Sequence, residues 1–212
     1  MDITIFKDIK QTARPFYRNI NLILTRIQEG ASKDIVKKIR AEKDKENRNI
    51  LKQKLPAICF SGQFTKRADN AIKEHSGYIC LDFDGYKSNR DLLQEKERLS
   101  KDKFVYSVFI SPSGNGLKVL VKIPPIVDDH KSYFLSLQKY YDSEYFDKTC
   151  KNISRVCYES YDPLIHVNAH SSLWDKIEEQ EYVEVSKHND IPTIPVTDEN
   201  KIIDILINCF LL

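Results

Sequence analysis

The stretch from residue 77 to residue 161 alternates apolar strand-like runs with helical ones, and this order limits the fold more than any other feature. Four runs have the length and apolar content of buried strands, at 78–83, 104–110, 117–123 and 155–161. Helical periodicity separates them at 89–100 and 128–146. The order strand, helix, strand, strand, helix, strand is that of the split βαβ unit. We therefore predict an α+β fold with an RRM/ferredoxin-like core.

The segments on either side of this core have a different character. Residues 1–66 contain apolar strand candidates at 3–6 and 57–60, with a helix that ends at Gly30 between them. They predict an N-terminal helical α/β lobe, followed by the RRM-like core over 67–184. Residues 185–212 read as a linker and the start of a C-terminal helix. An apolar terminal helix suggests a fragment of a longer protein.

Composition excludes several classes of protein. No apolar run approaches the ~20 residues that cross a bilayer, and the N-terminus lacks the apolar core of a signal peptide. Five cysteines without close pairs indicate thiols of a reducing cytoplasm. The net charge of +2 does not by itself indicate nucleic acid. Residues 33–54 carry nine Lys or Arg against four acids, which forms either a solvated helical face or a phosphate-facing patch.

The split βαβ topology predicts which side chains meet. Its usual strand order is 4-1-3-2, so the end of the first strand, the turn between strands two and three, the end of the second helix and the start of the fourth strand share one edge. Asp82, Asp84, the turn at 111–116, Asp147 and Arg155 are therefore expected to converge. By the same argument, residue 162 lies at the opposite edge.

Two carboxylates lead this predicted site. Asp82 and Asp84 are two residues apart on a strand, so they point to the same face. Neighbouring carboxylates repel unless a cation lies between them, and their hard oxygen atoms suit Mg²⁺ or Mn²⁺. Asp147 offers a third carboxylate. The alternative is a plain strand-end turn at Asp84 and Gly85.

The companions of these acids have the chemistry of phosphate binding. The glycines of the turn at 111–116 allow backbone N–H groups to approach an anion, and Lys118 adds a positive charge. Arg155 offers a forked phosphate contact. Each feature also has a simpler explanation on its own. The turn could be an ordinary hairpin, Asp147 an exposed acid at a helix end, and Arg155 a structural arginine.

Four segments carry a resemblance to a known family: LPAICFSGQF at 55–64, SGYICLDFDG at 76–85, SPSGNGLK at 111–118 and SRVCYESYDP at 154–163. Together they resemble the archaeo-eukaryotic primase superfamily, and within it the VirE N-terminal, BT4734-like primase-polymerase domains. The resemblance covers roughly residues 1 to 175.

This resemblance implies template-directed nucleotidyl transfer with two Mg²⁺ or Mn²⁺ ions. Asp82, Asp84 and Asp147 would be the catalytic metal ligands, with Asp162 as a less favoured third acid. The residues implied to bind nucleotide are Ser111, Ser113, Gly114, Asn115, Gly116, Lys118 and Arg155, while Lys66 and Arg67 would contact nucleotide or template. Many superfamily members have His at the position of Lys118, so the role of this residue departs from the pattern.

The implied partners are a single-stranded DNA template, nucleoside triphosphates and a helicase or C-terminal primase domain, in replication of a bacterial mobile element or phage. Two other functions stay open at this point. The same acids suit a two-metal nuclease, and aromatic residues on the strands (Phe83, Tyr106 and Tyr158) suit a non-catalytic RRM-like nucleic-acid-binding module.

Two further kinds of site are disfavoured. A replication-initiator endonuclease needs a His-hydrophobic-His pair, which the sequence lacks. A zinc site of Cys150, Cys157, His166 and His170 does not have the spacing of a common finger, so core or surface thiols are favoured there.

Overall fold

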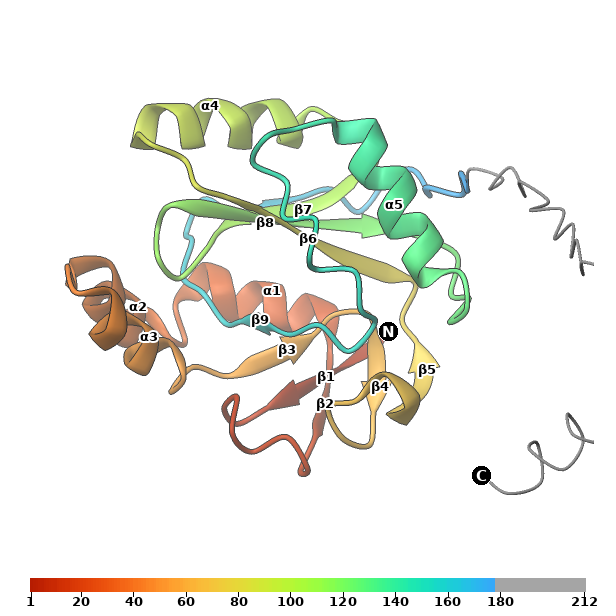
Figure 1. Cartoon of the computed structure of the whole chain (residues 1–212), viewed down its shortest axis with the longest axis horizontal. Helices are drawn as coiled ribbons and strands as arrows, with labels where there is room; N and C mark the ends of the chain where they lie inside the picture. Colours follow the sequence, from red (N-terminus) through yellow and green to blue (C-terminus); the bar gives the residue numbers. More distant parts are fainter. Residues whose placement is uncertain (178–212) are drawn as a thin grey trace, which may run out of the picture. The chain divides into compact units, whose positions relative to one another are not determined.

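The computed structural model describes residues 1–177, so the linker and helix expected within 185–212 lie outside the described residues. The described part is mixed α/β, with five α-helices and antiparallel sheets (Figure 1). The helices are α1 (Ile20–Glu29), α2 (Lys33–Ala41), α3 (Lys45–Lys52), α4 (Asn89–Ser100) and α5 (His130–Tyr141). This agrees with the predicted α+β class.

Three antiparallel sheets contain the strands. The N-terminal part of the chain, residues 1–66, is called the first lobe. Its sheet contains β1 (Asp2–Phe6), β2 (Phe16–Asn19) and β3 (Ala57–Cys59), and β9 (Cys157–Tyr158) joins it to give the order β2-β1-β3-β9. The core sheet has the order β10-β7-β8-β6, from β6 (Tyr78–Asp84), β7 (Val105–Ile110), β8 (Gly116–Lys122) and β10 (His166–Val167). A small sheet pairs β4 (Gly62–Phe64) with β5 (Ile72–His75).

The predicted order 4-1-3-2 is confirmed for its first three strands, since β8 lies between β6 and β7. The prediction that 155–161 is the fourth core strand is wrong. Its residues 157–158 form β9 and pair with β3 in the first-lobe sheet. Buried Glu159 holds this segment there, because its carboxylate accepts two hydrogen bonds from Arg26 of α1 at 2.8 and 3.0 Å.

A short segment at 145–147 takes the place beside β6. Phe146 forms an antiparallel bridge with Phe83, and the amide of Asp147 donates to the carbonyl of Asp82 at 2.8 Å. The amide of Asp84 donates in turn to the carbonyl of Tyr145 at 2.7 Å. The fourth position of the split βαβ order is thus filled by the residues that lead into Asp147.

Two hydrophobic clusters cover the core sheet. On one face, β6 and β8 pack against α4 and α5, which lie above the sheet in Figure 1. On the other face, Phe109 and Leu120 share a cluster with Ile23 and Ile27 of α1 and with Ile58 of β3. The first lobe therefore packs on the core sheet through α1. Within the described residues, no helix has the length and apolar character to span a membrane.

Candidate metal and phosphate site

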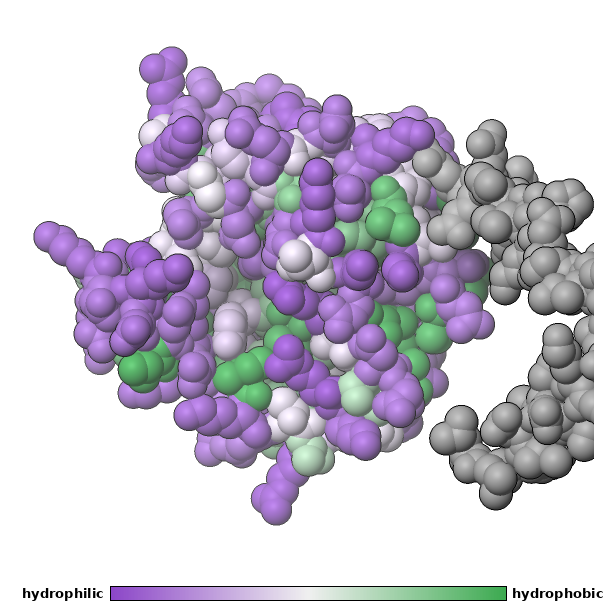
Figure 2. Space-filling model, viewed as in Figure 1, coloured by the Kyte–Doolittle hydropathy of each residue, from purple (hydrophilic) through white to green (hydrophobic). Residues whose placement is uncertain are grey.

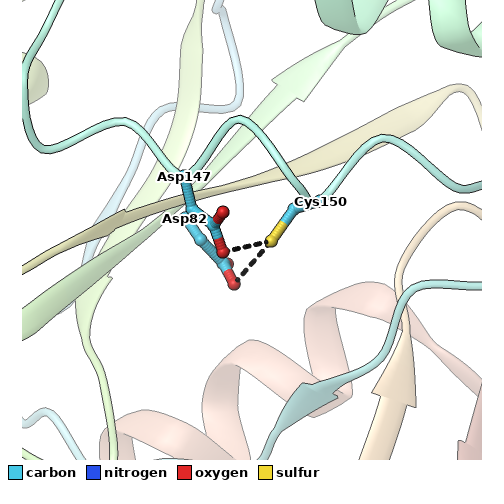
Figure 3. Close-up of side chains that lie close together, drawn as sticks. All are labelled: Asp82, Asp147 and Cys150. Atoms are coloured by element: carbon cyan, nitrogen blue, oxygen red, sulfur yellow. Dashed lines mark hydrogen bonds between the residues drawn. The ribbon is translucent and has the colours of Figure 1, made fainter.

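The centre of the site is a group of three potential metal ligands on two segments. Asp82 comes from β6, while Asp147 and Cys150 come from the chain that follows α5 (Figure 3). One ligand atom from each residue lies within 4.8 Å of the other two. The Sγ atom of Cys150 lies 2.9 Å from Oδ2 of Asp147 and 3.4 Å from Oδ2 of Asp82. The three side chains point toward one another in Figure 3.

Local hydrogen bonds explain how the chain brings Asp147 and Cys150 together. Oδ1 of Asp147 accepts from the amide of Thr149 at 2.9 Å and from its hydroxyl at 2.7 Å, which closes a tight Asx-type turn. The amide of Cys150 lies 3.4 Å from the carbonyl of Asp147. The turn thus directs the thiol back over Oδ2 of Asp147, the oxygen that Thr149 leaves free.

Two cationic side chains converge on the same carboxylates. Lys118 is the cross-strand partner of Asp82 in the β6–β8 register, and its Nζ lies 2.7 Å from Oδ2 of Asp82. Burial alone would lower the pKa of Lys118, but the carboxylates of Asp82 and Asp84 raise it overall. Nη2 of Arg155 lies 3.8 Å from Oδ2 of Asp82 and 3.7 Å from Oδ2 of Asp147.

Asp147 carries its negative charge readily at this position. Partial burial would raise its pKa, but hydrogen bonds from Cys150 and Thr149 and the charge of Arg155 lower the pKa overall. The site therefore holds an ionised carboxylate on the loop side and a carboxylate–ammonium pair on the strand side. This arrangement suits a divalent cation, because such an ion stabilises both carboxylates at once.

Asp84 lies next to this group but is not part of it within residues 1–177. Its strand partner is Gly116, and a Cβ atom at that position would lie 2.1 Å from Oδ1 of Asp84. Burial raises the pKa of Asp84, and the negative charges of Asp82 and Asp147 add to this effect against the opposing charge of Lys118. A cation bound beside Asp84 would therefore favour its ionised form.

The turn between β7 and β8 has polar groups without partners. The hydroxyl oxygen of Ser111 is buried and makes no hydrogen bond, while Ser113 is half-buried and Asn115 is exposed. Gly114 adopts φ +81°, a left-handed conformation that favours glycine. The buried Nε of Arg155 also lacks a partner. Donors that have no protein acceptor are available to an anionic ligand such as a phosphate.

The remaining predicted residues lie apart from the three-ligand group. Lys66 and Arg67 are exposed after β4, where the amide of Arg67 donates to the carbonyl of Thr12 at 3.1 Å. Asp162 is buried in an ion pair with Lys96, whose Nζ lies 2.6 Å from its Oδ2. The amide of residue 110 donates to the same oxygen at 2.9 Å. Asp162 therefore ties α4 to the end of β7, directly before the 111–116 turn. The prediction that residue 162 lies at the opposite edge of the sheet is wrong, because the segment that carries it packs beside β7 rather than continuing as a core strand.

Sequence reasoning did not single out three contributors to the site. Cys150 is a buried core thiol, as expected, but its contacts with Asp82 and Asp147 were not predicted. The other two lie in the basic segment 33–54, for which a phosphate-facing patch was one of the two interpretations. Arg40 of α2 donates to the carbonyl of Ser111 at 3.1 Å and so reaches the turn from the first lobe. Lys52 of α3 is close enough to Asp84 and Lys118 for their charges to influence its pKa, which burial lowers. Among the described residues, the zinc set with His166 and His170 does not assemble.

The sequence model of the BT4734-like N-terminal domain family matches residues 50–166, which is more than half of the chain. The chain belongs to this family. The matched part of the BT4734-like domain contains β6, the β7–β8 turn and the loop with Asp147 and Cys150. No curated protein and no solved structure matches the chain.

Proposed function

We propose that this BT4734-like domain is a nucleotidyltransferase, the catalytic domain of a DNA primase or primase-polymerase. The observation that carries the proposal is the convergence of Asp82 and Asp147, 65 positions apart in the numbering, beside a lysine, an arginine and a glycine-containing turn. Acids that hold cations, set beside donors that suit phosphates, are the parts that phosphoryl and nucleotidyl transfer require.

In this proposal Asp82, Asp84 and Asp147 hold two Mg²⁺ or Mn²⁺ ions. When bound, such ions lower the pKa of an attacking 3′-hydroxyl and neutralise the charge of the leaving pyrophosphate. The chain's own residues position the reactants. The backbone of the β7–β8 turn and the hydroxyl of Ser111 bind the triphosphate, and Arg155 binds a phosphate oxygen with its free Nε.

Lys118 has two tasks in the same scheme. Without metal, its ammonium group neutralises Asp82 at 2.7 Å. When a cation takes over that role, the ammonium is released toward the phosphates beside the turn. Lys118 stands where many superfamily members have His. Both side chains can donate to a phosphate, and Lys118 does so as a point charge.

The template would approach over the basic segment at 33–54. Its helices α2 and α3 are covered by hydrophilic side chains in Figure 2, and the outline of the molecule is notched between them and α4 above. The β7–β8 turn lies at this notch in Figure 1, in agreement with the Arg40–Ser111 contact. Single-stranded DNA and nucleoside triphosphates are the proposed ligands, with Lys66 and Arg67 as more distant contacts. We further propose that the domain acts in the cytoplasm, in replication of a mobile element or phage.

A non-catalytic RRM-like module is disfavoured by burial. Such a module stacks bases on aromatic side chains that its sheet exposes. Phe83 and Tyr106 are 0% and 5% exposed, because α5 covers one and α1 the other. Tyr158 is half-buried, but it lies on β9 in the sheet of β1, β2 and β3 rather than in the core sheet. The core sheet therefore has no open aromatic face at these three positions.

The decisive test is extension on single-stranded DNA with labelled nucleotides and Mn²⁺, with and without a primer. We expect incorporation by the wild type and none by Asp82→Asn, while Asp128→Asn, at an exposed acid outside the site, retains it. Full incorporation by Asp82→Asn would defeat the proposal. Degradation of labelled DNA without added nucleotides would instead identify a two-metal nuclease.

A further inference from the structure

The thiol of Cys150 belongs to the hydrophobic core cluster beneath α5 and also faces two carboxylates. It is buried, and its Sγ contacts one oxygen of Asp147 at 2.9 Å and one of Asp82 at 3.4 Å. In a tetrahedral zinc site with usual bond lengths, a sulfur and an oxygen ligand lie about 3.5 Å apart. The Asp82 distance already fits this spacing, and the Asp147 distance of 2.9 Å needs to open by about 0.6 Å.

The chemistry of this ligand set differs from that of a purely carboxylate site. Mg²⁺ prefers hard oxygen ligands and gains nothing from sulfur, whereas Zn²⁺ and Co²⁺ bind thiolates strongly. Two carboxylates and one thiolate leave the fourth position of a tetrahedral ion open. The set therefore favours a thiophilic ion over the hard ions proposed for catalysis.

An independent observation indicates that this position demands positive charge. Lys118 places its ammonium nitrogen 2.7 Å from Oδ2 of Asp82, the same oxygen that faces Cys150, although its side chain is only 11% exposed. Arg155 adds a second positive group within 3.8 Å of both carboxylates. Burying an ammonium group is costly unless an anion compensates for it, so Lys118 stands in for a cation here.

We propose that Asp82, Asp147 and Cys150 form a binding site for a thiophilic divalent cation of the Zn²⁺ or Co²⁺ class. Binding forms a metal–sulfur bond at Cys150, and the thiol proton is released to solvent. The ion displaces the ammonium of Lys118 from Asp82. Because the site uses two of the proposed catalytic carboxylates, Zn²⁺ bound there competes with Mg²⁺ and inhibits nucleotidyl transfer. Only this last consequence rests on the proposed function.

Cobalt spectroscopy tests the site without reference to activity. Titration of the purified chain with Co²⁺ is expected to give a near-ultraviolet sulfur-to-cobalt charge-transfer band. Cys150→Ser removes that band and weakens Co²⁺ binding by about 100-fold or more, since even outer partners of metal ligands contribute 10–100-fold. Cys59→Ser, at a buried thiol bonded to the carbonyl of Ser154, is the matched control and keeps the band.

The outcomes separate the two proposals. A charge-transfer band that survives in Cys150→Ser, or its absence in the wild type, overturns the assignment of Cys150. If Cys150→Ser does not fold by circular dichroism, Asp147→Asn tests the site through affinity: it keeps the thiol and removes a carboxylate ligand, so the band should appear only at much higher Co²⁺ concentration. Unchanged Co²⁺ affinity in Asp147→Asn overturns the proposed site. In the extension assay, Zn²⁺ is expected to inhibit the wild type in competition with Mg²⁺ and Cys150→Ser much less. Equal inhibition of both proteins defeats the regulatory part alone.

Discussion

The stand-in role of Lys118 leads to a quantitative prediction about Lys118→Met. Methionine keeps most of the side-chain volume but removes the ammonium group, so Asp82 loses its partner at 2.7 Å. Both side chains are about nine-tenths buried, with 9% and 11% exposure. Breaking a buried ion pair by removing one partner costs about 3–5 kcal/mol. Arg155, 3.8 Å away and 40% exposed, compensates in part, so we expect a loss of about 3 kcal/mol.

A divalent cation should restore that stability. A metal ion present at a hundred times its dissociation constant stabilises the folded state by about 2.7 kcal/mol. In Lys118→Met the ion no longer has to displace an ammonium group, so it binds more tightly than in the wild type. Urea denaturation followed by circular dichroism, with and without Mn²⁺, measures both effects. Mn²⁺ is expected to raise the free energy of unfolding more in Lys118→Met than in the wild type.

A matched lysine provides the control. Lys101 pairs with Glu97 at 2.6 Å on α4, but both side chains are largely exposed. Exposed pairs contribute little, so Lys101→Met should leave the unfolding midpoint and its Mn²⁺ dependence unchanged. If Lys118→Met were as stable as the wild type without metal, or if Mn²⁺ stabilised both proteins equally, Lys118 would not be a substitute for a cation.

Three further predictions follow from other parts of the structure. Gly116→Ala should greatly reduce nucleotide incorporation, because its Cβ would lie 2.1 Å from Oδ1 of Asp84 and 2.9 Å from the carbonyl oxygen of Phe83; normal incorporation would refute this. Asp162→Asn should lower the free energy of unfolding, measured by urea denaturation, by about 3–5 kcal/mol and leave Co²⁺ affinity unchanged. Weakened Co²⁺ binding would instead show that Asp162 takes part in the metal site. The third prediction concerns two buried histidines, His75 and His130, whose Nε2 and Nδ1 atoms lie 3.0 Å apart. Burial lowers the pKa of His75 to about 4 and that of His130 to about 3. Since the unfolded chain binds more protons below pH ~6.5, the stability that this pair contributes is complete above that pH. It decreases by about 5 kcal/mol toward pH 4.5, roughly half of it from each histidine, whereas a flat pH profile of unfolding free energy would contradict the assignment.

The sequence by itself determined the local framework of the site. Continuous apolar runs of strand length and a short glycine-containing turn predict a β7–β8 hairpin, and helical periodicity predicts α4 and α5. Because β6 then pairs with β8, Asp82 lies opposite Lys118 and Asp84 opposite Gly116. The strands and the turn are local features that a sequence pattern records directly. The register that places Asp82 opposite Lys118 comes from the structure.

Only the tertiary structure decided which distant segments complete the site. The run at 155–161 has the apolar pattern of a core strand, yet β9 joins the first-lobe sheet, and residues 145–147 pair with β6 instead. Cys150 contacts Asp82, which is 68 residues away in the sequence, and Arg40 contacts Ser111, which is 71 residues away. An apolar pattern states that a segment is buried but not against which sheet. That choice depends on packing and buried charge, such as Glu159 with Arg26, which no local window of sequence contains.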